Sequence, residues 1–235
     1  MMIRSLGIAM GLAVFAGNVS ASTDVSADAT KARIRETIKG CAQGLERLLP
    51  GDYYFCAAAR DISRGHDSLG RERLRDAAHW ASKPAQYVLG LMYYNGDEGP
   101  SNRPLGIAWL ALAAERHDPR FEPAFAEAFA HATPEERAQA NVYWLKMREE
   151  FGDPVAGRRA RRRFLAEMRN ITAISVFGGS MELNGMAPMD QFAMTRKLNA
   201  AGDEFFRGMD GTVTVGEMTL VPIGQAVDHP QPGPH

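Results

Sequence analysis

The sequence has few cysteines and lacks the short motifs that mark most catalytic and cofactor chemistry. Its 235 residues include two cysteines and no C-x-x-C pair, which argues against a dithiol redox site. It contains no P-loop, no dinucleotide-binding fingerprint and no H-E-x-x-H, and its six histidines are scattered along the chain. We therefore expect no catalytic residue, no cofactor and no metal site.

The sequence also lacks an excess of either charge. The formal net charge is −1, so the overall composition does not favour a polyanionic partner. We therefore expect no nucleic-acid partner.

No long apolar run is present near the N-terminus. The run over residues 6–16 is shorter than the roughly 20 residues that a membrane-spanning helix needs. It follows one arginine and precedes a Val-Ser-Ala triplet, the layout of a cleavable secretory signal. We predict a signal peptide over residues 1–21, a flexible mature N-terminus over 22–31, and a periplasmic or secreted protein. An uncleaved membrane anchor is the alternative.

The two cysteines fall in the part of the chain that would be exported, where oxidation is permitted. Cys41 and Cys56 flank Pro50-Gly51, a turn signal between two helical patterns, which puts them at matched heights on the arms of a hairpin. A disulfide closing this loop of about 15 residues would stabilise the fold by roughly 3 kcal/mol. Two free buried thiols are the alternative.

A 35-residue period is the most informative pattern in the chain. Pro84, Pro119 and Pro154 are spaced 35 residues apart, and Trp109 recurs as Trp144 at the same offset. A fixed period in this range marks stacked helical hairpins, each of which buries its apolar face against its neighbours. The period therefore predicts how the chain folds, but it does not identify what the protein binds.

The clearest unit has one helix after Pro84 and another after Asn102, which is a good N-cap, with a break over residues 96–100. Small Gly90 lets the second helix approach the first closely. The framework of the unit consists of Ala85, Leu89, Gly90, Tyr93, Gly96, Ala108, Trp109, Ala113 and Ala114. This framework resembles the Sel-one-like repeat family, a branch of the tetratricopeptide-type superhelical proteins. The resemblance covers one repeat of about 35 residues.

Helical patterns also flank this unit. They predict three helices before it and a degenerate hairpin after it, over residues 32–49, 53–64, 69–81 and 119–153. The run Thr133-Pro134-Glu135-Glu136 opens the last helix as a capping sequence. We therefore expect a helical repeat domain over residues 32–169.

The composition changes in the C-terminal quarter. Residues 171–177 alternate weakly as a strand, 189–207 have a helical pattern, and 212–221 form two alternating runs, as in a β-hairpin. We predict a small α+β appendix over 170–225 and a disordered tail over 226–235. The expected fold is mainly α, a short superhelical array of antiparallel helical hairpins with this small C-terminal appendix.

Five arginines follow the third periodic proline: Arg158, Arg159, Arg161, Arg162 and Arg163. On a helix they form like-charged i,i+4 pairs, which repel by a few tenths of a kcal/mol, so a counter-charge is expected. Two interpretations stay open. The face is solvated or paired with acids of the chain, or it binds an anionic envelope component or an anionic lipid surface.

A second stripe of the helix after Pro84 holds Tyr87, Leu91, Tyr94 and Asn95. First helices line the concave side of stacked hairpins, and aromatic side chains give a large contact area at low entropy cost. These residues are predicted to bind a peptide or helix of a protein partner, unless they pack on adjacent helices instead. The family resemblance implies a non-catalytic adaptor or scaffold. An exported cell-wall enzyme with its site in the appendix is a less favoured alternative.

Overall fold

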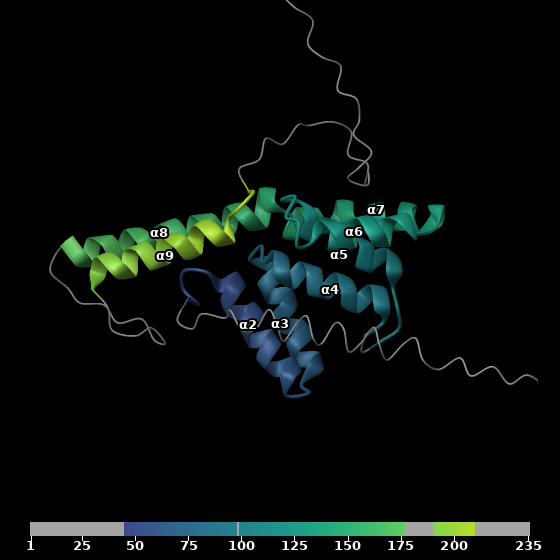
Figure 1. The fold of residues 1–235 in the computed structure, drawn as a ribbon, viewed down its shortest axis with the longest axis horizontal. Coiled ribbons are helices and arrows are strands. Elements are labelled where there is room, and N and C mark those ends of the chain that lie inside the picture. Colours follow the sequence, from purple (N-terminus) through teal and green to yellow (C-terminus); the bar gives the residue numbers. More distant parts are fainter. Residues whose placement is uncertain (1–44, 98, 177–189, 210–235) are drawn as a thin grey trace, which may run out of the picture.

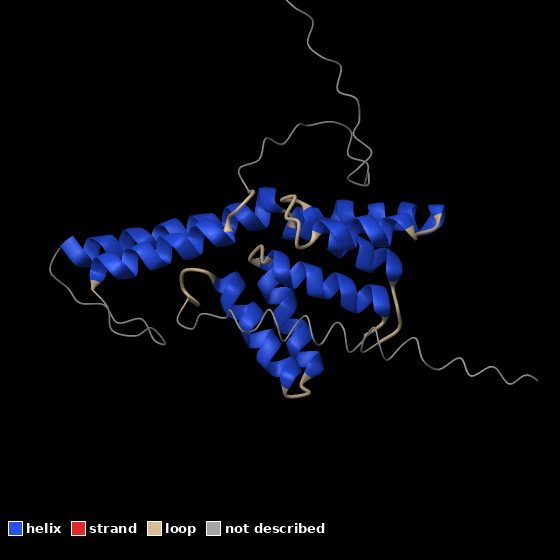
Figure 2. Cartoon of the chain, in the orientation of Figure 1, coloured by secondary structure: helices blue, strands red, loops and turns tan. Residues whose placement is uncertain are grey.

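The computed structural model describes residues 45–97, 99–176 and 190–209, and within these ranges the chain is helical and contains no strand (Figure 1). Short loops join most of the helices (Figure 2). A π-helical turn, η1, leads into α8. The elements in chain order are α2 (Pro50–Ser63), α3 (Asp67–His79), α4 (Lys83–Asn95), α5 (Arg103–Ala114), α6 (Glu122–Ala130), α7 (Pro134–Phe151), η1 (Asp153–Gly157), α8 (Arg158–Val176) and α9 (Gln191–Phe205).

Proline and capping side chains set where the helices begin. Proline suits the first helical positions because the N–H that it lacks would have no partner there. It occupies such positions in α2, α4, α5, α6, α7 and η1. Asn102 caps α5 by accepting a hydrogen bond from the Leu105 backbone N–H at 3.1 Å. Thr133 and Glu136 form a reciprocal capping box at α7, which confirms the predicted capping sequence.

Helix α5 lies at the centre of the described fold, because α4, α6 and α7 all pack on it. All residues from Gly106 to Ala114 are buried. The crossing of α4 and α5 depends on two glycines. A Cβ on Gly90 would lie 2.6 Å from Leu110 Cγ, and a Cβ on Gly106 would lie 2.6 Å from the Tyr94 backbone nitrogen. These distances confirm the close approach predicted at Gly90.

Three apolar clusters hold the helices together. The first cluster joins α2, α3, α4 and α5 with Phe151 at the end of α7. The second cluster joins α8 and α9 with Leu45, Leu48 and Leu49. The third cluster joins α5, α6 and α7. The core is therefore divided along the chain, and α5 contributes to two of its three parts.

The start of α2 differs from the sequence prediction. Pro50 and Gly51 form the first turn of the helix, so the predicted turn at this point is wrong. Gly51 is needed here because a Cβ would lie 2.7 Å from the Phe205 ring. Residues 45–49 form a turn rather than the end of a helix. The rest of the predicted helix over 32–49, the signal peptide and the flexible N-terminus lie outside the described residues.

The structure of α8 differs from the sequence prediction for the C-terminal region. Residues 171–176 are helical, so the predicted strand over 171–177 is wrong. Phe164, Met168 and Ile171 follow one another at helical steps of four and three, and they pack against α9 in the second cluster. This packing outweighs the weak β preference of the isoleucines and valine at the end of α8.

The predicted helix over 189–207 is confirmed as α9, and Gly208, with φ of 76°, follows its end. The predicted β-hairpin over 212–221 and the tail over 226–235 lie outside the described residues. Among the residues that are described, no helix is both long and apolar enough to span a bilayer.

Residues that are 35 positions apart in the sequence occupy equivalent structural positions only in part. Pro84 and Pro154 open elements, whereas Pro119 lies in the connection before α6. Trp109 and Trp144 both lie on the second helix of a pair and both contact the first cluster. Trp109 is 3 % exposed, whereas Trp144 is half-buried beneath Arg148, whose Cζ lies 5.0 Å from the ring centroid. Trp144 is therefore less tightly packed than Trp109.

The Gly106→Ala variant tests the α4–α5 crossing. In an unstrained helix interior this change would stabilise by about 1 kcal/mol. Here the new methyl meets backbone atoms, so we expect a net loss of about 1–3 kcal/mol in urea unfolding. Gly99→Ala is the control, because no heavy atom lies within 4 Å of a Cβ there. Equal stability of the two variants would contradict the close crossing.

Candidate functional site

The predicted repeat framework is part of the core. Seven of its residues are buried, namely Ala85, Leu89, Gly90, Ala108, Trp109, Ala113 and Ala114. Tyr93 is half-buried against the first cluster, and Gly96 ends α4 with φ of 82°. These positions build the α4–α5 pair. The seven buried residues offer no functional group to the solvent.

The predicted partner-binding stripe lies beside the third cluster. Tyr87, Leu91 and Tyr94 are half-buried and pack against the third cluster. The Tyr87 ring centroid lies 5.3 Å from that of Phe121, and Arg103 Cζ lies 4.6 Å from the centroid of Tyr94. Asn95 is exposed at the end of α4. The stripe thus combines packing on a neighbouring helix with a partly exposed edge, and its role in binding stays a prediction.

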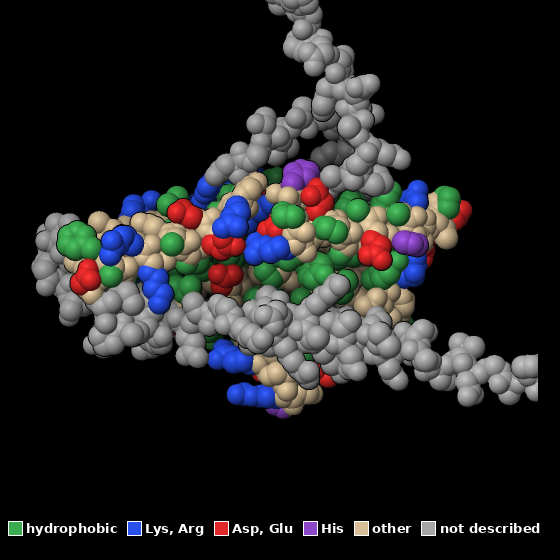
Figure 3. All heavy atoms as spheres, in the orientation of Figure 1, with side chains coloured by type: hydrophobic (Ala, Val, Ile, Leu, Met, Phe, Trp, Pro, Cys, Tyr) green, Lys and Arg blue, Asp and Glu red, His purple; other side chains and the backbone are tan. Residues whose placement is uncertain are grey.

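The five arginines spread around α8 rather than forming one patch. Arg159 donates to the His79 carbonyl at 2.5 Å, and Arg163 donates to the Arg47 carbonyl at 2.9 Å. Arg161 Cζ lies 5.7 Å from the Phe206 ring centroid. Arg158 and Arg162 are exposed. Figure 3 shows basic and acidic side chains mixed along α8 and α9 on the visible face. Binding of an anionic partner by these arginines stays a prediction.

A network of four charged side chains, here called the ion network, consists of Lys83, Glu115, Arg116 and Asp153. Lys83 Nζ lies 2.7 Å from Glu115 Oε2 and 3.2 Å from Asp153 Oδ1. Arg116 donates two bonds to the Asp153 carboxylate, at 2.7 and 2.8 Å. Arg116 also donates to the Phe205 carbonyl at 2.5 Å. The ion network therefore ties α4, the end of α5, η1 and the end of α9 to one another.

The bases of the ion network hold Asp153 ionised. Burial by itself would raise the pKa of Asp153, but the nearby charges and hydrogen bonds of Lys83 and Arg116 outweigh it and lower the pKa below its ordinary value. A carboxyl whose pKa is depressed by folding stabilises the fold above its unfolded-state pKa of about 4. This stabilisation is lost as the pH falls through the lower folded-state pKa.

A cavity of about 330 Å³ lies beside the ion network. It is called the Asp52 cavity here. It is lined by Leu45, Asp52, Phe55, Cys56, Lys83, Pro84, Arg116, Asp118, Arg120, Phe121, Ala201, Glu204, Phe205 and Arg207. Burial, reinforced by the charge of Glu204, raises the pKa of Asp52 to about 7, although Arg116 opposes the shift. The cavity thus places a carboxyl that titrates near neutral pH among aromatic side chains.

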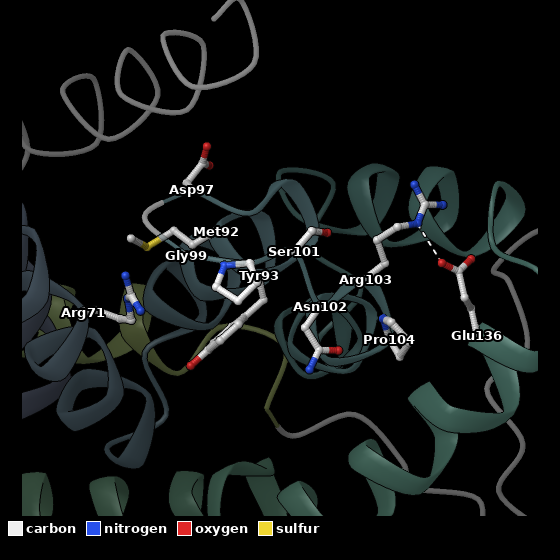
Figure 4. A pocket seen from close by; sticks show the side chains of 11 residues that line it. Arg71, Met92, Tyr93, Asp97, Gly99, Ser101, Asn102, Arg103, Pro104 and Glu136 are labelled. Carbon is white, nitrogen blue, oxygen red and sulfur yellow. Dashed lines mark hydrogen bonds and ion pairs between the residues drawn. The ribbon is translucent and has the colours of Figure 1, made fainter. Parts of the chain in front are cut away.

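A second cavity, of about 500 Å³, lies between the α4–α5 connection and α7 (Figure 4). Arg103 closes one end of it, where its Nε donates to Glu136 Oε1 at 2.9 Å. Arg71 and Tyr93 lie toward its other end (Figure 4). Its other polar lining residues, Asp97, Ser101 and Asn102, belong to the α4–α5 connection. The Asp52 cavity differs in that two of its lining residues, Lys83 and Arg116, are members of the ion network.

The sequence analysis did not identify Asp52, Lys83 or Arg116 as site residues. A charged residue in the first turn of a helix ordinarily indicates capping or a solvated end. The available signal was the position of Lys83 before Pro84 and of Asp153 before Pro154, two period lengths apart. Cys41 lies outside the described residues, so the Cys41–Cys56 bridge stays a prediction. No group of three metal-ligating side chains occurs in the described ranges.

Comparison with known proteins identifies no relative: no protein-family model, no curated protein and no solved structure matches the chain. The resemblance to Sel-one-like repeats therefore rests on the framework residues of α4 and α5 alone. The function has to be argued from the geometry of the molecule.

The Lys83→Met variant tests the ion network. It leaves Glu115 without its cation and Asp153 with Arg116 alone, and breaking such a buried pair costs about 3–5 kcal/mol. We expect a loss of this size in urea unfolding at pH 7. Arg120→Met removes the exposed partner of Asp118, a pair worth under about 1 kcal/mol, and is the control. Similar losses in the two variants would show that burial does not strengthen the network.

The Asp52→Asn variant tests the buried carboxyl. Unfolded chains release this proton near pH 3.8, whereas the fold retains it until about pH 7. The free energy of unfolding of the wild type therefore falls as the pH rises between these values. Asparagine cannot ionise, so we expect the variant to melt a few degrees higher than wild type at pH 8. The advantage of the variant shrinks toward pH 4.

The control for this pH dependence is Asp67→Asn, because Asp67 occupies the first turn of α3 as Asp52 does that of α2. At pH 8 this substitution is not expected to raise the melting temperature, because it removes a favourable acid from a helix N-terminus. A pH-independent effect of Asp52→Asn would contradict the raised pKa.

Proposed function

We propose that the protein is a non-catalytic adaptor that holds a peptide or helix of a partner protein in a periplasmic or secreted setting. The observation that carries this proposal is the partly exposed stripe of Tyr87, Leu91 and Tyr94 along α4, with Asn95 exposed at its end. Tyrosine and leucine beside an amide suit a polypeptide ligand. Rigid support comes from α5, which is buried beneath α4.

The chemistry of the Asp52 cavity gives little support to catalysis. Its lining among the described residues includes no serine, threonine or histidine to act as a nucleophile, so the Asp52 carboxyl, which titrates near neutral pH, has no such group to activate. Its basic side chains each face an acid, and Arg116 and Lys83 are tied to the backbone as well. An exported cell-wall enzyme is thus less well supported than an adaptor.

The arginines of α8 give weaker support to an anion-binding function. Three of the five contact the rest of the protein, and one of these, Arg163, also pairs with Glu167. Only Arg158 and Arg162 are exposed without a hydrogen bond or ion pair to the described residues. Two exposed charges supply little affinity for a polyanion at physiological salt.

Site-specific photocrosslinking tests the adaptor proposal. A photoreactive residue at Asn95 is expected to give discrete adducts with a partner in the exported compartment. The same group at Glu149, an exposed position of α7, is the control and is expected to give none. Tyr94→Ala removes stripe contact area, so it should reduce the Asn95 adducts at least tenfold.

Two outcomes contradict the adaptor proposal. One is identical adducts from Asn95 and Glu149. The other is a fall in melting temperature of Tyr87→Ala and Tyr94→Ala with undiminished adducts, because that result assigns the tyrosines to packing alone. Tyr143→Ala, at a half-exposed tyrosine of α7, controls for the general cost of losing such a side chain.

A further inference from the structure

The charges around the Asp52 cavity are nearly all matched. Lys83 faces Glu115 at 2.7 Å, and Arg116 binds Asp153 through two hydrogen bonds. Arg120 donates to Asp118 at 2.5 to 3.0 Å in the loop before α6. At the end of α9, Arg207 is paired with Glu204. Four bases therefore face four acids, and they come from α4, the end of α5, the loop before α6, η1 and the end of α9.

Asp52 is the fifth acid. No hydrogen bond or ion pair joins its carboxyl to the described residues. Asp52 is half-buried and forms part of the cavity wall, so a ligand in the cavity lies beside it. When the Asp52 carboxyl is ionised, the negative charges around the cavity outnumber the positive charges by one. A buried carboxylate without a partner is costly, and a cation that enters the cavity removes this cost.

The cavity also has the shape and walls for an organic cation. Its volume of about 330 Å³ corresponds to roughly ten water molecules. Phe55, Phe121 and Phe205 line it, and aromatic faces attract ammonium and guanidinium groups in desolvated sites. An anion would find few donors, because Arg116 already donates to Asp153, Phe205 and Ala81.

We propose that the Asp52 cavity binds an organic cation, an ammonium or guanidinium group carried on a short apolar stem. Asp52 forms the ion pair and the phenylalanines enclose the stem. The group belongs either to a free amine or to a lysine or arginine side chain of a polypeptide. The site lies at the ends of α2, α4 and α9, away from Asn95 at the far end of α4, and it does not depend on the adaptor function.

Isothermal titration calorimetry with 2-phenylethylammonium at pH 8 tests the site. Wild type is expected to bind with a dissociation constant of about 1 mM or tighter, in line with the size of the ligand. Asp52→Asn should weaken binding at least tenfold, while Asp67→Asn should leave it unchanged. Neutral 2-phenylethanol and anionic 3-phenylpropionate are expected not to bind. Because the carboxyl of Asp52 has a pKa of about 7, lowering the pH to 6 should weaken binding about tenfold.

Two further measurements complete the test. Ala201→Leu narrows the cavity without changing its charged side chains and should also weaken binding at least tenfold.

A lysine-containing pentapeptide and its norleucine counterpart then separate the two sources of the cation. Binding of the free amine alone assigns a small-molecule ligand, and tighter binding of the lysine peptide assigns a polypeptide side chain. The proposal would be overturned if neither the free amine nor the lysine peptide binds. It would also be overturned if wild type and Asp52→Asn bind with equal affinity, or if the anionic probe binds more tightly than the amine.

Discussion

The ion network is the interaction on which the described structure depends most. Lys83 and Arg116 are only 4 and 9 % exposed, and each uses its donors on both carboxylates and backbone carbonyls. Gln86 extends the network by donating to the Phe151 carbonyl at 2.9 Å. Buried charges are tolerable only when every partner is in place. The end of α5, the start of α4, η1 and the end of α9 are therefore held in one arrangement.

This arrangement also determines which charged groups remain available to a ligand. Because the network and its neighbours neutralise one another, they hold the helix ends without offering a free charge to a ligand. Asp52 is the exception, since it shares the cavity but has no partner among the described residues. The partly exposed stripe of α4 lies farther along the same helix. The α4–α5 pair thus supports the two proposed ligand sites, the stripe for a polypeptide and the Asp52 cavity for an organic cation.

Local sequence signals predicted the α4–α5 pair well. The crossing at Gly90, the Asn102 cap and the Thr133 capping box are set by steric space and by hydrogen bonds within a few residues, which a sequence pattern records directly. The prediction failed where a distant contact decides. Pro50-Gly51 has the composition of a turn, yet it forms the first turn of α2, where the Phe205 ring packs against the Cα of Gly51 and leaves no room for a Cβ. Residues 171–176 stay helical because α9 covers the face of α8.

The sequence by itself determined the helical class, the starts of α4, α5 and α7 and the framework of the α4–α5 pair, because proline, caps and apolar periodicity act over one or two turns. Only the tertiary structure decided that Lys83 meets Asp153 and that Asp52 is enclosed without a base of its own. Both features arise because the fold brings together side chains that are far apart in the sequence. The physical reason is that a charge is defined as paired or unpaired by its three-dimensional surroundings, which no local pattern specifies.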